Sequence, residues 1–220
     1  MPKIPTRKEL ELAQKLTTLP EREIKEKAEQ QGLKLLVRSA EADIFQKGKQ
    51  IIRIIRNNQK FPRNLKKIFY IHEIAHELFP TNIIKYKAAM INKNQTIYYS
   101  DYIPMTLEHE KVAEEYSGYY TTSYQRIIKL REDEEKGKYK QQIKLNETPE
   151  YKQLIQKMEQ AGIKPNSGLV NRGLNKKGQI TFFEMDAITP DKVRQYIKNQ
   201  PQQKQEKINK LLTRLEKINK

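Results

Sequence analysis

The spacing of hydrophobic residues changes from a helical period to a strand period near the start of the chain. Residues 7–31 carry leucines at helical spacing and contain a break at Pro20, which predicts two short helices. Three runs rich in leucine, isoleucine and valine follow at 33–39, 42–48 and 49–56. Their composition predicts three strands, the last two joined by a Lys-Gly-Lys turn.

A helical period returns between Asn64 and Phe79 and predicts the most regular helix of the chain. The apolar residues of this segment fill one broad arc, and Pro80 stops the helix. Two more strands are expected at 84–93 and 95–104, around an Asn-Lys-Asn turn.

The remaining half of the chain is predicted to be mainly helical. Helices are expected at 106–138, 148–162, 190–198 and from 201 to the end, and a hairpin is expected from 167–174 and 179–185. Apolar residues recur at helical spacing in the last helix, and we interpret them as a face that docks on the protein's own body. These elements predict an α+β protein.

Composition narrows the class of protein. The 220 residues are 36% hydrophobic and 32% charged, which suits one large domain or two small lobes with a buried core. There is no cysteine, which excludes disulfides and thiolate metal ligands and favours the cytoplasm. No apolar run approaches the roughly 20 residues that cross a bilayer. The chain start lacks the apolar region of a secretory signal, so we expect no membrane association.

The net charge of +16 favours an acidic partner such as nucleic acid. Lysine is spread along the whole chain, however, and neither an RNP-type strand nor a zinc finger is present in the sequence. We therefore expect non-specific attraction to nucleic acid, and a basic nucleic-acid-binding adaptor is one alternative function.

The long helix contains His72-Glu73-Ile74-Ala75-His76, which matches the HExxH motif of zinc peptidases. Two histidines one helical turn apart can share a zinc ion, and the glutamate between them can act as the catalytic base. Both histidines also fall inside the apolar arc of this helix, where packed core histidines are common. The motif therefore predicts either a zinc site or two buried structural histidines.

A zinc site of this kind needs a third protein ligand. The candidates in the sequence are Glu108, His109, Glu110 and Glu114. The segment from Glu110 to Tyr116 resembles the Glu-x-x-Ala-x-x-Phe helix of ImmA-like metallopeptidases. That resemblance implies Glu110 as the third ligand.

The order of the predicted elements resembles a protein kinase, of the type that includes aminoglycoside phosphotransferases. Three strands, a helix, two strands, more helices and a polar hairpin follow one another between residues 32 and 187. Arg53 is similar to the third-strand lysine that contacts phosphate. Glu73, or Glu77 as second choice, is similar to the helix glutamate that pairs with that lysine.

The hairpin carries the most specific part of this resemblance. Asn171 corresponds to the metal-binding asparagine of a kinase catalytic loop, and Glu184 corresponds to the aspartate of the Asp-Phe-Gly motif. Asn166 stands at the position of the catalytic aspartate, where an amide cannot accept a proton. The resemblance thus implies ATP and magnesium at Arg53, Glu73, Asn171 and Glu184, without efficient kinase chemistry.

These patterns predict a two-lobed kinase-like fold with a five-stranded antiparallel N-lobe sheet and a reduced helical C-lobe that contains the hairpin. The expected parts are a helical extension (1–31), an N-lobe (32–104), a C-lobe (105–200) and a basic amphipathic helix (201–220). The predicted function is that of a degenerate kinase that binds a protein partner, with or without nucleotide. A zinc peptidase is the enzymatic alternative.

Overall fold

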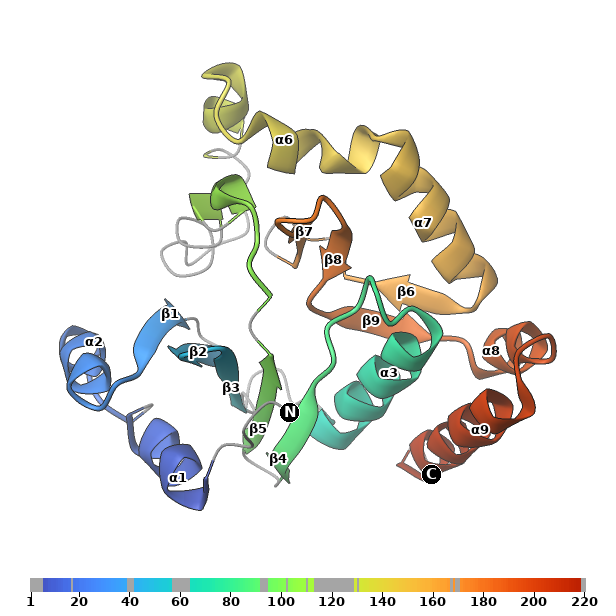
Figure 1. Cartoon of the computed structure of the whole chain (residues 1–220), viewed down its shortest axis with the longest axis horizontal. Helices are drawn as coiled ribbons and strands as arrows, with labels where there is room; N and C mark the ends of the chain where they lie inside the picture. The colour runs from blue at the N-terminus through green and yellow to red at the C-terminus, as the bar shows by residue number, and fades with distance from the viewer. Residues whose placement is uncertain are drawn as a thin grey trace. The chain divides into compact units, whose positions relative to one another are not determined.

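The computed structural model describes the chain except for residues 1–5, 17, 39–41, 57–63, 92–94, 102, 110, 113–128, 130, 167, 169, 170, 219 and 220. The described residues form two compact units (Figure 1). Unit 1 contains residues 1–65 and 86–103, and unit 2 contains residues 66–85 and 104–220. Each unit has its own hydrophobic core.

Unit 1 is an antiparallel sheet packed against two helices. Its strands are β1 (Lys34–Arg38), β2 (Ala42–Lys47), β3 (Gln50–Arg56), β4 (Lys87–Ile91) and β5 (Gln95–Asp101), and they pair in the order β1-β2-β3-β5-β4. Alternation along the strands places Phe45, Ile52 and Ile54 on one face. These side chains share a core with residues of α1 (Arg7–Leu16) and α2 (Glu21–Gln30), so the two helices cover that face.

Unit 2 combines helices with two short strand pairs. Its helices include α3 (Leu65–Leu78), α6 (Lys140–Ile143), the 3-10 helix η1 (Lys144–Glu147), α7 (Pro149–Gln160), α8 (Pro190–Ile197) and α9 (Gln202–Ile218). The antiparallel strand pairs are β6 (Ile163–Pro165) with β9 (Met185–Ile188), and β7 (Arg172–Leu174) with β8 (Ile180–Phe182). The predicted α+β class with mainly antiparallel sheets is confirmed.

The core of unit 2 is built from segments far apart in the sequence. Ile74 and Ala75 of α3 are fully buried in it, together with Phe182 of β8 and Ile208 and Leu212 of α9. The apolar face of the last helix therefore docks on the protein's own body, as its spacing predicts. The sequence pattern grouped α3 with the strands at 32–104, whereas the buried side chains of this helix pack with the later elements. These later elements cover the wide apolar arc of α3.

The segment that follows α3 also differs from the prediction. The strand expected at 84–93 begins at Lys87, because the residues before it pair with β8. Phe182 N donates to Asn82 O at 2.7 Å, and Ile84 N donates to Phe182 O at 3.3 Å. Ile83 thereby forms a parallel bridge with Phe182.

Other elements match the sequence in part. The helix expected at 148–162 begins as predicted, because Thr148 Oγ1 accepts from Tyr151 N at 3.3 Å and Pro149 occupies the first turn. The hairpin is present as β7 and β8, but its second arm ends at Phe182 and β9 follows as a separate strand. The helix expected at 106–138 falls partly on residues outside the described ones.

In the part of the chain that is described, no helix is long and apolar enough to span a membrane.

Candidate functional site

The HExxH residues lie in the C-terminal half of α3, as the helical spacing predicts. His72 is buried, with 6% of its surface exposed, and His76 is half-buried one turn later. Residues four apart on a helix have Cβ atoms about 5–6 Å apart, so both imidazoles project from one side of α3. The same helix buries Ile71, Ile74 and Ala75 in the core of unit 2, which holds its orientation.

The imidazole of His76 is oriented by the backbone just beyond α3. Its Nδ1 lies 2.7 Å from Ile83 O, and a carbonyl oxygen can only accept a hydrogen bond. Nδ1 therefore carries a proton, and in the neutral form of the ring the lone pair lies on Nε2. The acceptor is itself fixed, because the backbone on both sides of Ile83 is bonded to Phe182 and Asn82 Nδ2 donates to Ile180 O at 2.9 Å.

Glu73 lies between the two histidines in a partly buried position. Its Oε1 is buried and has no hydrogen-bond partner among the described residues. Burial raises the pKa of Glu73, and the negative charge of Glu77 raises it further, while Lys85 and Lys207 lower it. Of these neighbours, Glu77 is engaged in an ion pair with Lys207 of α9 at 2.6 Å. The result is a carboxyl group whose pKa lies above its ordinary value, beside the two histidines.

The candidates for a third metal ligand fall into two groups. Glu110 and Glu114 lie outside the described residues. Glu108 accepts a hydrogen bond from Gln142 N at 3.3 Å, and the His109 ring stacks on Phe183 with ring centres 5.1 Å apart. Within the described ranges, no three His, Asp or Glu side chains gather as a metal-binding group.

The hairpin brings the kinase-like polar residues of unit 2 together. Phe183 N donates to Asn171 O at 2.9 Å, which places the following residue, Glu184, beside Asn171. Asn166 N donates to Glu184 O at 3.0 Å, and Asn166 Oδ1 accepts from Gly168 N at 2.9 Å. Asn166, Asn171 and Glu184 thus lie on neighbouring backbone segments, and all three side chains are half-buried.

Arg53 belongs to unit 1, where it lies on β3. Its Nη1 donates to Tyr86 Oη at 3.3 Å, and its guanidinium carbon is 5.9 Å from the centre of the Tyr86 ring. Glu73 belongs to unit 2, so the two residues of the expected kinase ion pair are each described within a different unit. The pairing of Arg53 with Glu73 therefore stays a prediction.

Neither a family model nor a curated protein or solved structure matches the chain. The candidate sites consequently depend on the geometry of this chain's own residues.

Unit 2 also contains a buried arginine that sequence reasoning missed. Arg172 is 5% exposed, its guanidinium lies 5.3 Å from the centre of the Tyr151 ring, and its Nη1 donates to Gln142 O at 3.5 Å. The amide of Gln142 donates in turn to Arg172 O. Burial lowers the pKa of Arg172, and Tyr151 opposes this effect. A single arginine in a three-residue strand gives no periodic signal, so its burial could not be read from the sequence.

Proposed function

We propose that this protein is a zinc-dependent peptidase whose metal is bound by His72 and His76 of α3. The observation that carries the proposal is the hydrogen bond from His76 Nδ1 to Ile83 O at 2.7 Å. Histidines that ligate zinc through Nε2 almost always donate the other ring N–H to a carbonyl or carboxylate, which fixes the tautomer and the ring orientation. His76 makes a hydrogen bond of this kind through Nδ1 to Ile83 O.

The donor set fits zinc in chemistry as well as in spacing. Imidazole nitrogen binds zinc at about 2.0–2.1 Å, and two histidines at positions i and i+4 present their nitrogens to one point. Glu110 is the third ligand that the sequence favours, and its position lies outside the described residues. When bound, zinc lowers the pKa of a coordinated water to about 7 and polarises a carbonyl group.

Glu73 is the residue that would move the proton in this reaction. It follows His72 directly, and its buried Oε1 is available to accept a proton from water. The raised pKa brings the carboxyl nearer to the range in which a group can both take up and release a proton. Glu73 therefore acts as general base towards water and then returns the proton to the leaving amine.

Zinc content and hydrolysis test this proposal separately. The full-length protein, stripped with chelator and titrated with zinc, should bind one equivalent per chain. His72→Ala and His76→Ala should each lose this binding. Glu73→Gln should keep the zinc and lose hydrolysis of an unstructured protein substrate such as casein. Glu77→Gln, the matched change one turn later, should keep both. Absence of stoichiometric zinc, or zinc that survives His76→Ala, would reject the site.

A degenerate kinase-like protein that binds a partner is the second candidate function. The adjacency of Asn171 and Glu184 supports it, because amide and carboxylate oxygens are suitable ligands for magnesium. In this proposal, unit 1 corresponds to an N-lobe that carries Arg53 as the candidate phosphate contact, and unit 2 corresponds to a reduced C-lobe. Thermal unfolding with ATP and magnesium tests it. Stabilisation by nucleotide that is lost in Glu184→Ala is expected, and no shift at millimolar nucleotide would refute nucleotide binding.

For either function we propose the cytoplasm, because the 220 residues include no cysteine.

A further inference from the structure

The helix α9 carries a row of basic side chains that neither candidate site uses. Lys210, Arg214 and Lys217 occur at positions i, i+4 and i+7, so they share one side of the helix. All three side chains are exposed, and within the described part of the chain none of them has an ion-pair partner. We call these three residues the basic stripe.

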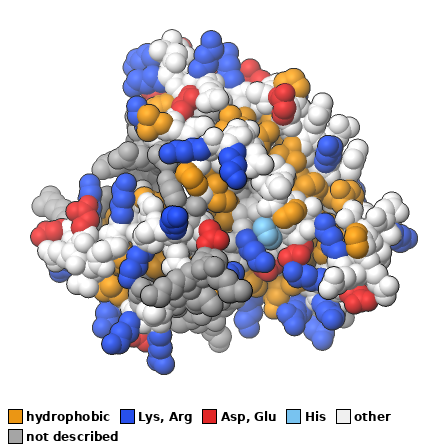
Figure 2. All heavy atoms as spheres, in the orientation of Figure 1, with side chains coloured by type: hydrophobic (Ala, Val, Ile, Leu, Met, Phe, Trp, Pro, Cys, Tyr) orange, Lys and Arg blue, Asp and Glu red, His pale blue; other side chains and the backbone are white. Residues whose placement is uncertain are grey.

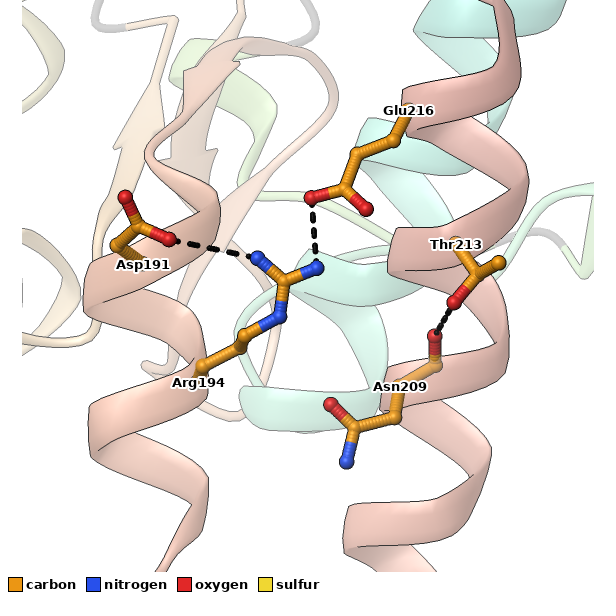
Figure 3. A network of polar contacts seen from close by, with 5 residues as sticks. All are labelled: Asp191, Arg194, Asn209, Thr213 and Glu216. Atoms are coloured by element: carbon orange, nitrogen blue, oxygen red, sulfur yellow. Dashed lines mark hydrogen bonds and ion pairs between the residues drawn. The ribbon is translucent and has the colours of Figure 1, made fainter.

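The acidic residues of α9 do not neutralise the basic stripe. Glu216 is directed towards α8, where its Oε1 accepts from Arg194 Nη2 at 2.6 Å (Figure 3). Arg194 also contacts Asp191 at 3.4 Å, so the guanidinium of Arg194 binds both Glu216 and Asp191. Glu206 lies one turn before Lys210 and accepts from Gln202 Nε2 at 3.1 Å. A neutral amide does not cancel the charge of a carboxylate, but within the described residues no ion pair joins Glu206 to Lys210. The stripe therefore presents three positive charges to solvent.

The opposite side of α9 is not available for insertion into a membrane. Ile208, Leu212 and Leu215 are at most 2% exposed because they are packed into the core of unit 2. An amphipathic helix that lies in a bilayer interface buries its apolar face between lipids. Since α9 has already used that face, its exposed side offers charge and polar groups such as Asn209 and Thr213.

The length of the stripe matches the spacing of phosphates in a nucleic acid. Lys217 lies seven positions after Lys210, which corresponds to about 10 Å of rise along the helix. One strand of B-form DNA carries one phosphate per about 3.4 Å of its helix axis, so about three phosphates fall within that axial length, where long Lys and Arg side chains can reach them. More Lys and Arg than Asp and Glu side chains are visible in Figure 2, in line with the net charge of +16, and this charge adds long-range attraction to the same partner.

We propose that the basic stripe of α9 is a docking surface for the phosphate backbone of duplex nucleic acid. Binding is independent of base sequence, because only phosphates meet the three charges. The expected contribution to the slope of log affinity against log salt is about −2.7, from three phosphates at about 0.9 each. This corresponds to about a 40-fold loss of affinity between about 50 and 200 mM salt.

A pair of charge-matched triple variants tests the location of the surface. The stripe variant is Lys210→Gln/Arg214→Gln/Lys217→Gln, and its control removes three exposed charges elsewhere in unit 2, by Lys152→Gln/Lys157→Gln/Lys177→Gln. Fluorescence anisotropy with a labelled random-sequence DNA duplex gives the affinity of the full-length protein at several salt concentrations. The stripe variant should lose two to three units of slope, about the number of charges removed, while the control keeps the slope of the wild type.

Three outcomes would overturn the proposal. Equal losses in both variants would show that the charge of the whole chain, rather than α9, attracts DNA. An unchanged slope in the stripe variant would show that the three residues meet no phosphate. Binding to vesicles that contain phosphatidylserine, in the absence of DNA binding, would assign the surface to lipid. The anisotropy measurements are repeated in the presence of chelator. An effect of zinc loss on DNA binding is thereby distinguished from an effect of the substitutions.

Discussion

The packing of His109 against Gly173 makes a strong prediction about unit 2. A Cβ atom added to Gly173 would lie against the His109 ring, 2.9 Å from its Cγ, and 3.0 Å from Met105 Cε. Cβ atoms essentially never approach other heavy atoms this closely. The Met105 end is flexible, but His109 is 5% exposed and stacks on Phe183, so the ring has little room to move.

The expected effect of Gly173→Ala follows from two opposing contributions. Overpacking a tight site costs about 1–3 kcal/mol of folding free energy. Replacing glycine by alanine at an ordinary backbone conformation gains about 0.4–1 kcal/mol by restricting the unfolded chain, and Gly173 does not have a positive φ. Gly173→Ala should therefore destabilise the wild type, yet be neutral or stabilising in a His109→Ala background, where the clash is absent.

A double-mutant cycle measures this difference. Urea unfolding of the wild type, both single variants and the double variant should give a coupling free energy of about 1–3 kcal/mol between the two positions, because the gain from restricting the unfolded chain occurs in both backgrounds and cancels. The m-values should be equal across the four proteins, so that the midpoints can be compared. The same cost for Gly173→Ala in both backgrounds would mean that His109 does not lie against Gly173.

Three further predictions concern stability and acidity. Leu212→Ala should cost about 2–5 kcal/mol in urea unfolding, because Leu212 is fully buried, whereas Leu107→Ala at a 65% exposed position should change stability by less than about 0.5 kcal/mol. Thr148→Ala should cost about 1 kcal/mol, because α7 loses its N-cap acceptor, and Thr148→Ser should restore it. Burial raises the pKa of Glu73, so the folded protein holds this proton where the unfolded chain has released it, and stability falls as the pH rises through that interval. Metal-free Glu73→Gln should thus be more stable than wild type at neutral pH and equal to it near about pH 4, as measured by thermal unfolding.

Periodic segments could be predicted from the sequence, because their side chains meet water or core at regular intervals. α3, β2 and β3 fall within a few residues of their expected ranges. β6 and β9 could not be predicted, since strands of three and four residues are too short to show alternation. Their pairing depends on the close approach of β6 and the start of α8. Gly162, with φ +74°, leaves no space there for a side chain beside Thr189 O.

The candidate site could be predicted in its residue types but not in its surroundings. The HExxH spacing identifies His72, Glu73 and His76 without any structure. The acceptor for His76, however, is a backbone oxygen whose position depends on the bridge between Ile83 and Phe182, nearly a hundred residues apart. A side-chain pattern contains no information about such a partner, because every residue carries the same carbonyl group.

The distance in sequence between α3 and α9 has a consequence for synthesis on the ribosome. The ion pair between Glu77 and Lys207 joins residues 130 positions apart, and the buried leucines of α9 complete the core around α3. At about 5–20 residues per second, α3 emerges about 7–26 s before the helix that covers it. During that interval the apolar arc of α3 is exposed and can be bound by chaperones. His72 and His76 reach their final surroundings only after α9 has been translated.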